Sequence, residues 1–278
     1  MRLQLCVLAS GSGGNSAVLR CPAGAVLIDI GIGPRTFGRR MAMLENPVPI
    51  DSISAVCLTH LDSDHFNPNW LLTLARLGVP LYCHVGLAQS IRDRAPSIDV
   101  RGFDCKTAFE PIASLRANAI SFAHDEAGSH GFVIDGFQTR IGYATDLGRV
   151  PEALLDAFVD LDLVCLESNY DRQMQLESDR PQFLKRRVMG GKGHLSNTQA
   201  FGAIVQMLDR CESNGSILPR HIVLLHRSRE CNCPKLLREY FSLDARIGPR
   251  LTLAEQFEPT PWLTPGTCAG DQLMLAWG

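Results

Sequence analysis

A dense group of potential metal ligands occupies residues 59–65 of this chain, in the sequence Thr-His-Leu-Asp-Ser-Asp-His. The group directly follows an apolar run with the composition of a buried strand. Imidazole and carboxylate groups gathered this closely are costly unless a cation neutralises them. In one arrangement His60 and Asp62 bind one ion, while Asp64 and His65 bind a second. The alternative is a polar loop with two surface histidines.

Three further ligand-type residues each stand at the end of an apolar, strand-like run. They are His124, Asp146 and His226. A lone His beyond a strand is usually a hydrogen-bonded core or surface residue. Three such positions after a dense ligand loop favour a metal site instead.

This order and spacing resemble the metallo-β-lactamase superfamily, whose hallmark is His-x-His-x-Asp-His followed by a distant His, an Asp and a final His. The resemblance implies an α/β fold, the four-layer αββα sandwich, and two divalent metal ions (Zn, Mn or Fe). Carried over by position, it places His60, Asp62 and His124 on the first ion, Asp64, His65 and His226 on the second, and Asp146 between both.

Two acidic positions refine this resemblance. Asp29 matches the superfamily's early strand-end Asp, which supports the ligands from behind. Asp62 is a departure, because most relatives have His there. An oxygen ligand in place of nitrogen hardens the site and favours manganese or iron over zinc.

Four motifs outside the ligands narrow the resemblance to the YycJ (WalJ) exonuclease-like branch, and the match extends over roughly residues 3–240. The motifs are residues 9–16, 143–148, 167–169 and 193–197. The branch implies a nuclease that acts on DNA ends. The chain departs from it at Tyr170, where the branch usually has His, and in residues 227–234.

In the related tRNA-processing and β-CASP nucleases, a His before a similar helix is implicated as proton donor, and an acidic residue partners it. His194 and Glu167 match these positions, so we predict them as catalytic residues together with Asp64. An imidazole gives a proton to a leaving alkoxide near neutral pH, and a carboxylate fixes its tautomer. The alternative is that His194 is a helix N-terminal residue that caps its neighbours.

A short basic run precedes His194 and is the predicted phosphate-binding patch. It consists of Lys185, Arg186, Arg187 and Lys192. A solvated face is the alternative. The formal net charge of −2 provides no basic field over the whole protein, so polyanion binding needs a local patch. The predicted partner is a nucleic acid or another phosphodiester.

The elements that position these residues fit one α/β domain over residues 1–278, with two sheets between outer helices. A glycine-rich turn is expected at residues 11–14, and Ser196 and Asn197 are suitable N-caps. We expect strands at 3–8, 17–19, 25–30, 53–58, 119–123, 131–134, 140–144, 163–166 and 221–225, and helices at 69–77, 151–159, 197–211 and 234–241.

We therefore predict a dinuclear metal-dependent hydrolase of phosphodiesters, a nuclease or exonuclease acting on DNA ends. Two alternatives stay open. One is a hydrolase of small esters, thioesters or lactones, and the other is a non-catalytic metal-binding protein. No stretch approaches the roughly 18 uninterrupted apolar residues of a spanning helix, so we expect a cytoplasmic protein without a membrane partner.

Overall fold

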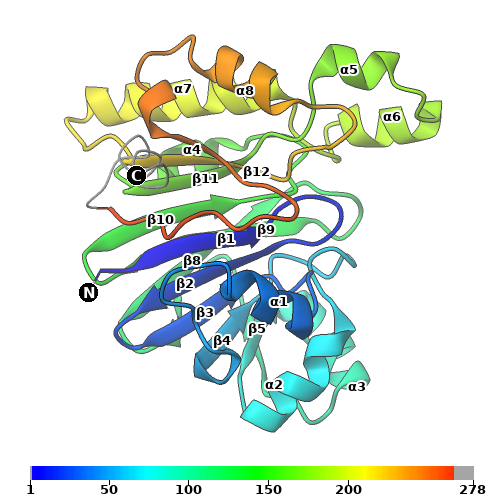
Figure 1. The fold of residues 1–278 in the computed structure, drawn as a ribbon, viewed down its shortest axis with the longest axis vertical. Coiled ribbons are helices and arrows are strands. Elements are labelled where there is room, and N and C mark those ends of the chain that lie inside the picture. The colour runs from blue at the N-terminus through cyan, green and yellow to red at the C-terminus, as the bar shows by residue number, and fades with distance from the viewer. Residues whose placement is uncertain (1, 266–278) are drawn as a thin grey trace. The chain divides into compact units, whose positions relative to one another are not determined.

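The computed structural model describes residues 2–265, which form two compact units. The first unit contains residues 2–119, Ile134–Thr139 and Glu255–Thr264. The second contains Ile120–Val133 and Arg140–Ala254. Each unit has its own sheet edge, helices and buried core, and Figure 1 labels the elements of both.

The first unit is built on a six-stranded sheet in which sequence order and spatial order agree. Its first three strands pair antiparallel, and the third to sixth strands run parallel. The strands are β1 (Gln4–Ala9), β2 (Ser16–Cys21), β3 (Gly24–Ile28), β4 (Ile53–Cys57), β5 (Leu81–His84) and β6 (Val100–Phe103). The helices of this unit are α1 (Pro34–Met41), α2 (Leu71–Leu77) and α3 (Val85–Arg94), with single 3-10 turns at Ile50–Ser52 and Pro68–Trp70.

Aromatic side chains close the core of the first unit beneath α1. The rings of Phe37 and Trp70, both fully buried, meet edge to face with centroids 5.5 Å apart. The indole Nε1 of Trp70 donates to the carbonyl of Ile32 at 2.7 Å. The start of α1 is therefore held against the segment that follows the ligand loop.

The second sheet has seven strands in the order β13-β12-β11-β10-β9-β8-β7. The run from β10 to β13 is parallel, and β7 pairs antiparallel with β8. By the residue ranges above, β7 belongs to the first unit, while β8, β9 and β10 contribute residues to both. The strands are β7 (Phe109–Ile112), β8 (Leu115–Phe122), β9 (Ser129–Gly136), β10 (Thr139–Ala144), β11 (Leu163–Glu167), β12 (His221–Leu225) and β13 (Leu251–Leu253).

In the second unit, α7 and α8 lie along one face of the parallel part of this sheet, over β11 and β12, while α5 and α6 lie to one side of them (Figure 1). The apolar faces of α7 and α8 pack with the strands into one buried cluster, which includes Met207 of α7 and Phe241 of α8. The helices are α4 (Glu152–Ala157), α5 (Arg172–Glu177), α6 (Gln182–Met189), α7 (Asn197–Ser213) and α8 (Pro234–Phe241), with a 3-10 turn at Gly248–Arg250. No helix within residues 2–265 is long and apolar enough to cross a bilayer.

Candidate active site

In the first unit, the ligand loop begins at the carboxyl end of β4, beside the carboxyl end of its parallel neighbour β3. Asp29 directly follows β3, and Thr59 lies two residues after β4. Carboxyl ends of parallel strands open at one edge of a sheet, which is where ligands bind in such folds. The backbone of Ile30 pairs with this loop, since its N–H donates to the carbonyl of His65 at 2.9 Å.

A hydrogen-bond network centred on Asp29 orients the two histidines of this loop. Nδ1 of His65 lies 2.7 Å from Oδ2 of Asp29, which also accepts from the hydroxyl of Thr59 at 2.9 Å. The same hydroxyl lies 2.8 Å from Nδ1 of His60. Because both Nδ1 atoms face acceptors, the Nε2 atoms carry the lone pairs, which is the arrangement of metal-ligating histidines.

The two carboxylates of the loop lie beside the imidazoles with which the sequence paired them. Oδ2 of Asp62 is 3.8 Å from Nε2 of His60, and Oδ2 of Asp64 is 3.8 Å from Nε2 of His65. The Asp62 side chain is 49% exposed, whereas that of Asp64 is 23% exposed. Each pair offers one nitrogen and one oxygen to an ion.

Asn15 also contacts this loop, and sequence reasoning gave it no role. Its Nδ2 lies 2.8 Å from Nε2 of His65, and its backbone N–H donates to the carbonyl of Asp64 at 2.6 Å. The expected glycine-rich turn brings it there: Gly14 has φ +131°, a conformation that favours glycine. Asn15 thus contacts the same imidazole nitrogen that a metal ion would use.

In the second unit, three candidate residues stand at the carboxyl ends of adjacent parallel strands. Asp146 lies two residues after β10, Glu167 ends β11 and His226 directly follows β12. His194, from the segment before α7, joins them, and one ligand atom from each of the four lies within 4.8 Å of the others. The shared sheet edge explains why residues far apart in the sequence meet.

Two imidazole–carboxylate contacts define this cluster. Nδ1 of His226 is 2.8 Å from Oδ1 of Asp146, and Nδ1 of His194 is 2.7 Å from Oε1 of Glu167. His194 also lies 3.2 Å from Oδ1 of Asp146. Glu167 is fully buried, and its Oε2 accepts from two backbone N–H groups, those of Leu147 and Leu195. Both oxygen atoms of the Glu167 carboxylate are therefore held by hydrogen bonds.

The charges of His194 and Glu167 stabilise each other. Burial raises the pKa of Glu167, but the charge and hydrogen bond of His194 and the hydrogen bond of His226 outweigh it and hold that pKa below its ordinary value. Burial likewise opposes the charged form of His194, but Glu167 and Asp146 prevail and raise the pKa of His194 to about 9. His194 keeps 21% of its side chain exposed, so it reaches toward solvent from a buried partner.

The helix that follows His194 is capped by another residue. Ser196 is the N-cap of α7, and with Gln199 it forms a reciprocal capping box. The side chain of His194 contacts Glu167 instead. His194 therefore does not cap α7, and the alternative interpretation of this residue as a capping residue is wrong.

His124 lies in the same unit as this cluster. Its side chain is 5% exposed, and its Nδ1 is 2.9 Å from the carbonyl of Gly193. Its ring centroid is 5.3 Å from that of His194. The carbonyl accepts from Nδ1–H and leaves Nε2 as the ligand atom, as in the histidines of the first unit.

Three predicted or supporting site residues have left-handed backbone conformations. The φ angles are +59° at Asp29, +51° at Asp146 and +51° at His226. Asp and His tolerate this region better than most residues, yet strain of this kind concentrates at functional positions. In each unit the donor set fits a divalent ion, because oriented imidazoles lie beside carboxylates at a sheet edge.

Sequence reasoning missed the residues that orient the ligands. The hydroxyl of Thr59 links Asp29 to His60 as described, and the amide of Asn169 donates to the carbonyl of His226 at 2.7 Å. Thr59 directly precedes the first ligand, which is a usable signal. The contact from the carbonyl of Gly193 to His124 has no side-chain signal at all.

The predicted basic patch is not one exposed cluster. Lys185 is buried on the packed face of α6, and its Nζ donates to the carbonyl of Leu176 at 2.6 Å. Arg187 forms an ion pair with Asp125. Arg186 and Lys192 are exposed. Lys185 therefore donates to a backbone carbonyl. It is not exposed, as a phosphate-binding side chain would have to be, so its predicted role is wrong.

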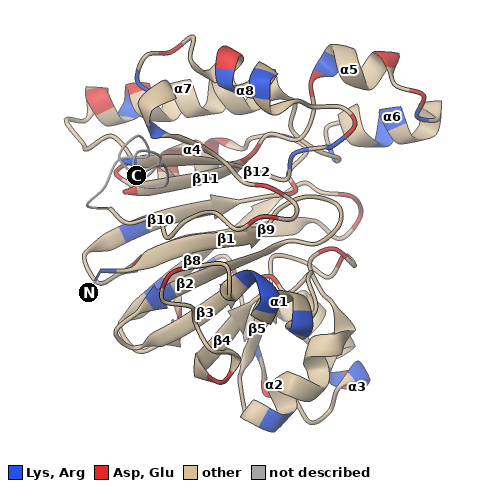
Figure 2. Cartoon of the chain, viewed as in Figure 1, with Lys and Arg blue, Asp and Glu red and all other residues tan. Residues whose placement is uncertain are grey.

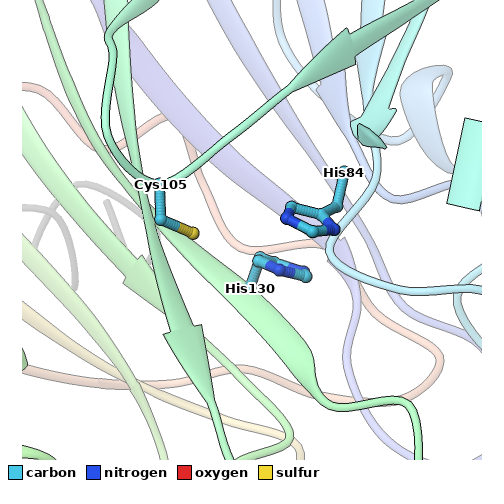
Figure 3. Close-up of side chains that lie close together, drawn as sticks. All are labelled: His84, Cys105 and His130. Atoms are coloured by element: carbon cyan, nitrogen blue, oxygen red, sulfur yellow. The ribbon is translucent and has the colours of Figure 1, made fainter. Parts of the chain in front are cut away.

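A second grouping of ligand-type side chains lies at the carboxyl edge of the first sheet. His84 ends β5 and Cys105 follows β6, and a ligand atom of His84 lies within 4.8 Å of the Cys105 sulfur (Figure 3). His130, which the figure also labels, belongs to β9 in the second unit. The side chain of His84 accepts from the backbone of Gly86 and so caps α3.

Comparison with known families identifies the chain. The family model described as "Beta-lactamase superfamily domain" matches residues 25–226, which include all seven predicted metal ligands. The chain belongs to the beta-lactamase superfamily. The predicted fold class, the α/β αββα metallo-β-lactamase fold, is confirmed by this match and by solved structures. The chain thus belongs to a family of metallo-β-lactamase-fold hydrolases, and this fold generally binds divalent metals, as in Zn²⁺-bound PqqB.

Two relatives confirm the predicted branch, and a third protein, known from a solved structure, shares the fold. Exodeoxyribonuclease YycJ of Bacillus anthracis is 24% identical over 243 residues, covering 86% of this chain and 87% of the relative. Exodeoxyribonuclease WalJ of Streptococcus pneumoniae is 24% identical over 235 residues, covering 83% of each. Zn²⁺-bound PqqB of Methylobacterium extorquens superposes with a TM-score of 0.67 at 17% identity, covering 92% of this chain and 99% of PqqB.

Proposed function

We propose that this protein is a dinuclear metal-dependent nuclease that acts on DNA ends. The proposal depends on the 2.7 Å contact between His194 and buried Glu167. This contact holds a proton donor beside side chains of the kinds that bind metal ions. The names of the YycJ and WalJ relatives support the substrate class. Two ions would be held by His60, Asp62, Asp64, His65, His124, Asp146 and His226.

Divalent ions supply Lewis acidity toward a phosphoryl group and activate water when they are bound. The chain's own residues supply the rest. Glu167 accepts from Nδ1 of His194 and fixes the imidazole, so Nε2 is the nitrogen that gives a proton to the leaving oxygen. Asp146 contacts both His194 and His226, and it links the proton donor to the proposed ligands.

A proton donor matters most for a poor leaving group. The sugar alkoxide released from a phosphodiester needs a proton, whereas the thiolate released from a thioester departs more readily without one. The His194–Glu167 pair therefore favours phosphodiester cleavage over hydrolysis of small thioesters. Arg186 and Lys192 are exposed near the same segment and are the proposed phosphate contacts of the patch. Because DNA lies inside the cell, we propose a cytoplasmic enzyme.

The test compares leaving groups in a His194→Ala variant of the metal-loaded protein. We expect it to slow release of nucleotides from DNA ends by about 10²–10⁴-fold, while cleavage of bis(p-nitrophenyl) phosphate falls far less. Metal content should stay at the wild-type level. The matched control is His84→Ala, which removes an imidazole from the other unit and should change neither rate.

Two outcomes contradict parts of the proposal. Equal losses on both substrates in the His194→Ala variant would remove the proton-donor role. A wild-type protein that hydrolyses a thioester but leaves DNA ends and the small diester intact would instead be the small-molecule hydrolase named as the alternative.

A further inference from the structure

A polar cavity of about 740 Å³ lies in the first unit, where the start of α1 faces the segment after the ligand loop. Eight residues line it, and none is acidic. The side chains that decide its chemistry are those of Arg35, Arg39, Asn67 and Asn69. None of the proposed metal ligands lines it, so the cavity is a separate feature.

The cavity wall presents mainly hydrogen-bond donors. Arg35 and Arg39 are exposed, and within residues 2–265 neither forms an ion pair with a carboxylate. A Cβ built on Gly33 would lie 3.7 Å from Nδ2 of Asn67 and 4.0 Å from Nδ2 of Asn69. Oδ1 of Asn67 is already occupied, because it accepts from the backbone of Asn69 at 3.0 Å. Two arginines and two asparagines whose amide nitrogens lie near Gly33 therefore line the same cavity.

One of the three arginines of α1 lies where the helix dipole disfavours a cation, while Arg39 and Arg40 lie in the last turn. The helix carries three arginines and no acidic residue, and its Lys/Arg segments are blue in Figure 2. Arg35 lies in the first turn, where the positive end of the helix dipole repels a cation. First-turn N–H groups also have no partner within their helix. An anion in the cavity would offset both effects.

We propose that this cavity binds a backbone phosphate of the DNA strand whose end lies in the active site, an inference that rests on the proposed nuclease function. Guanidinium groups match phosphate oxygens in a planar fork, and amide groups complete the contacts. Asn67 is two residues from His65, so their Cα atoms lie within about 7 Å. The backbone of Ile30 joins the two positions, since it donates to His65 and accepts from Asn67 at 3.0 Å. A strand whose end is cut beside His65 would thus present a further phosphate to the cavity.

The test replaces both cavity arginines, Arg35→Gln together with Arg39→Gln, in the metal-loaded protein. The matched control is Arg94→Gln with Arg116→Gln, which removes two exposed arginines from the same unit but outside the cavity. Binding of a phosphorothioate-protected single-stranded oligonucleotide is followed by fluorescence anisotropy across a series of salt concentrations. Inorganic phosphate is titrated separately, with the side-chain amide signals of Asn67 and Asn69 read by NMR.

We expect the cavity variant to reduce the salt slope of log K by about 0.7, because the contact with one phosphate of a single strand is lost. Cleavage of bis(p-nitrophenyl) phosphate should stay within about twofold of the wild type, and the control variant should keep the full slope. Inorganic phosphate should shift the two amide signals in the wild type but not in the cavity variant.

Failure of this inference is distinguishable from failure of the nuclease function. If phosphate shifts the amide signals but the protein neither binds nor cuts DNA, the cavity is an anion site and DNA is not its ligand. This result would contradict the proposal. If phosphate shifts nothing and the cavity variant keeps the wild-type salt slope, the cavity is not an anion site, whatever the enzyme cleaves.

Discussion

Nδ1 of His65 lies 2.7 Å from Oδ2 of Asp29, and both side chains are fully buried. The other carboxylate oxygen of Asp29 accepts from the backbone N–H of Thr59 at 2.8 Å. One carboxylate thus fixes both the tautomer of a proposed ligand and the start of the ligand loop. Such supporting carboxylates orient metal-bound histidines and raise their basicity.

Replacing this carboxylate tests its supporting role. Asp29→Asn keeps the shape but loses the charge, so we expect the affinity for Mn²⁺ or Zn²⁺ to fall by about 10–100-fold. Isothermal titration calorimetry of the metal-free protein measures this directly. Asp51→Asn, at an exposed carboxylate of the same unit, is the control and should bind as the wild type does. Unchanged affinity in the Asp29 variant would contradict the supporting role of this carboxylate.

The choice of metal depends on Asp62. Its carboxylate lies 3.8 Å from Nε2 of His60, so it offers oxygen where relatives offer nitrogen. We predict two ions per chain and more activity with manganese or iron than with zinc, and Asp62→His should move the preference toward zinc. Elemental analysis after reconstitution counts the ions, and rates with each metal rank them. One tightly bound ion per chain would contradict the dinuclear assignment.

The start of α7 depends on a capping serine. The hydroxyl of Ser196 accepts from the backbone N–H of Gln199 at 3.3 Å, and the Gln199 side chain accepts from the backbone N–H of Ser196 at 2.9 Å. Ser196→Ala should lower the free energy of unfolding by about 1 kcal/mol, measured by urea denaturation. Ser216→Ala, where the hydroxyl caps no helix start, should have a smaller effect. Equal effects in both variants would argue against the capping role.

The His194–Glu167 pair predicts a pH dependence in the metal-free protein. The pKa of His194 is raised from 6.5 to about 9, so its charged form stabilises the fold below pH 6.5, and this contribution is lost as pH rises through about 9. NMR titration of the imidazole should show protonation throughout the neutral range. Glu167→Gln should lower this pKa because the partner charge is gone. An imidazole of His194 that titrates near 6.5 in the wild type would rule out the pairing.

Most strands with strong apolar runs were predictable from the sequence, and several short elements were not. The run at 53–58 is β4, and the predicted helix at 197–211 is α7, which extends to Ser213. The predicted helix at 69–77 begins later, at Leu71, because Pro68–Trp70 forms a 3-10 turn capped by Asn67. Helix α6 was missed, since its charged residues obscure the packed face that buries Lys185.

The candidate site was likewise predictable from the sequence only in part. Residue type and position at strand ends predicted which side chains meet within each unit, as with Asp146 and His226. Their backbone supports were not predictable, because the carbonyl of Gly193 has no side-chain signature. The contact of Asn15 with His65 depends on a turn that brings residues 50 positions apart together. The prediction of one domain over residues 1–278 stays a prediction.

The left-handed backbone at Asp29, Asp146 and His226 lowers the stability of the fold at positions whose side chains the proposed site needs. Holding a residue with a Cβ in this conformation costs roughly 1–2 kcal/mol, and glycine would avoid that cost. Selection for heat resistance alone would therefore favour glycine at these three positions, at the loss of two proposed ligands and of the carboxylate that supports His65. Directed evolution for thermostability without an activity screen should therefore replace these three residues early.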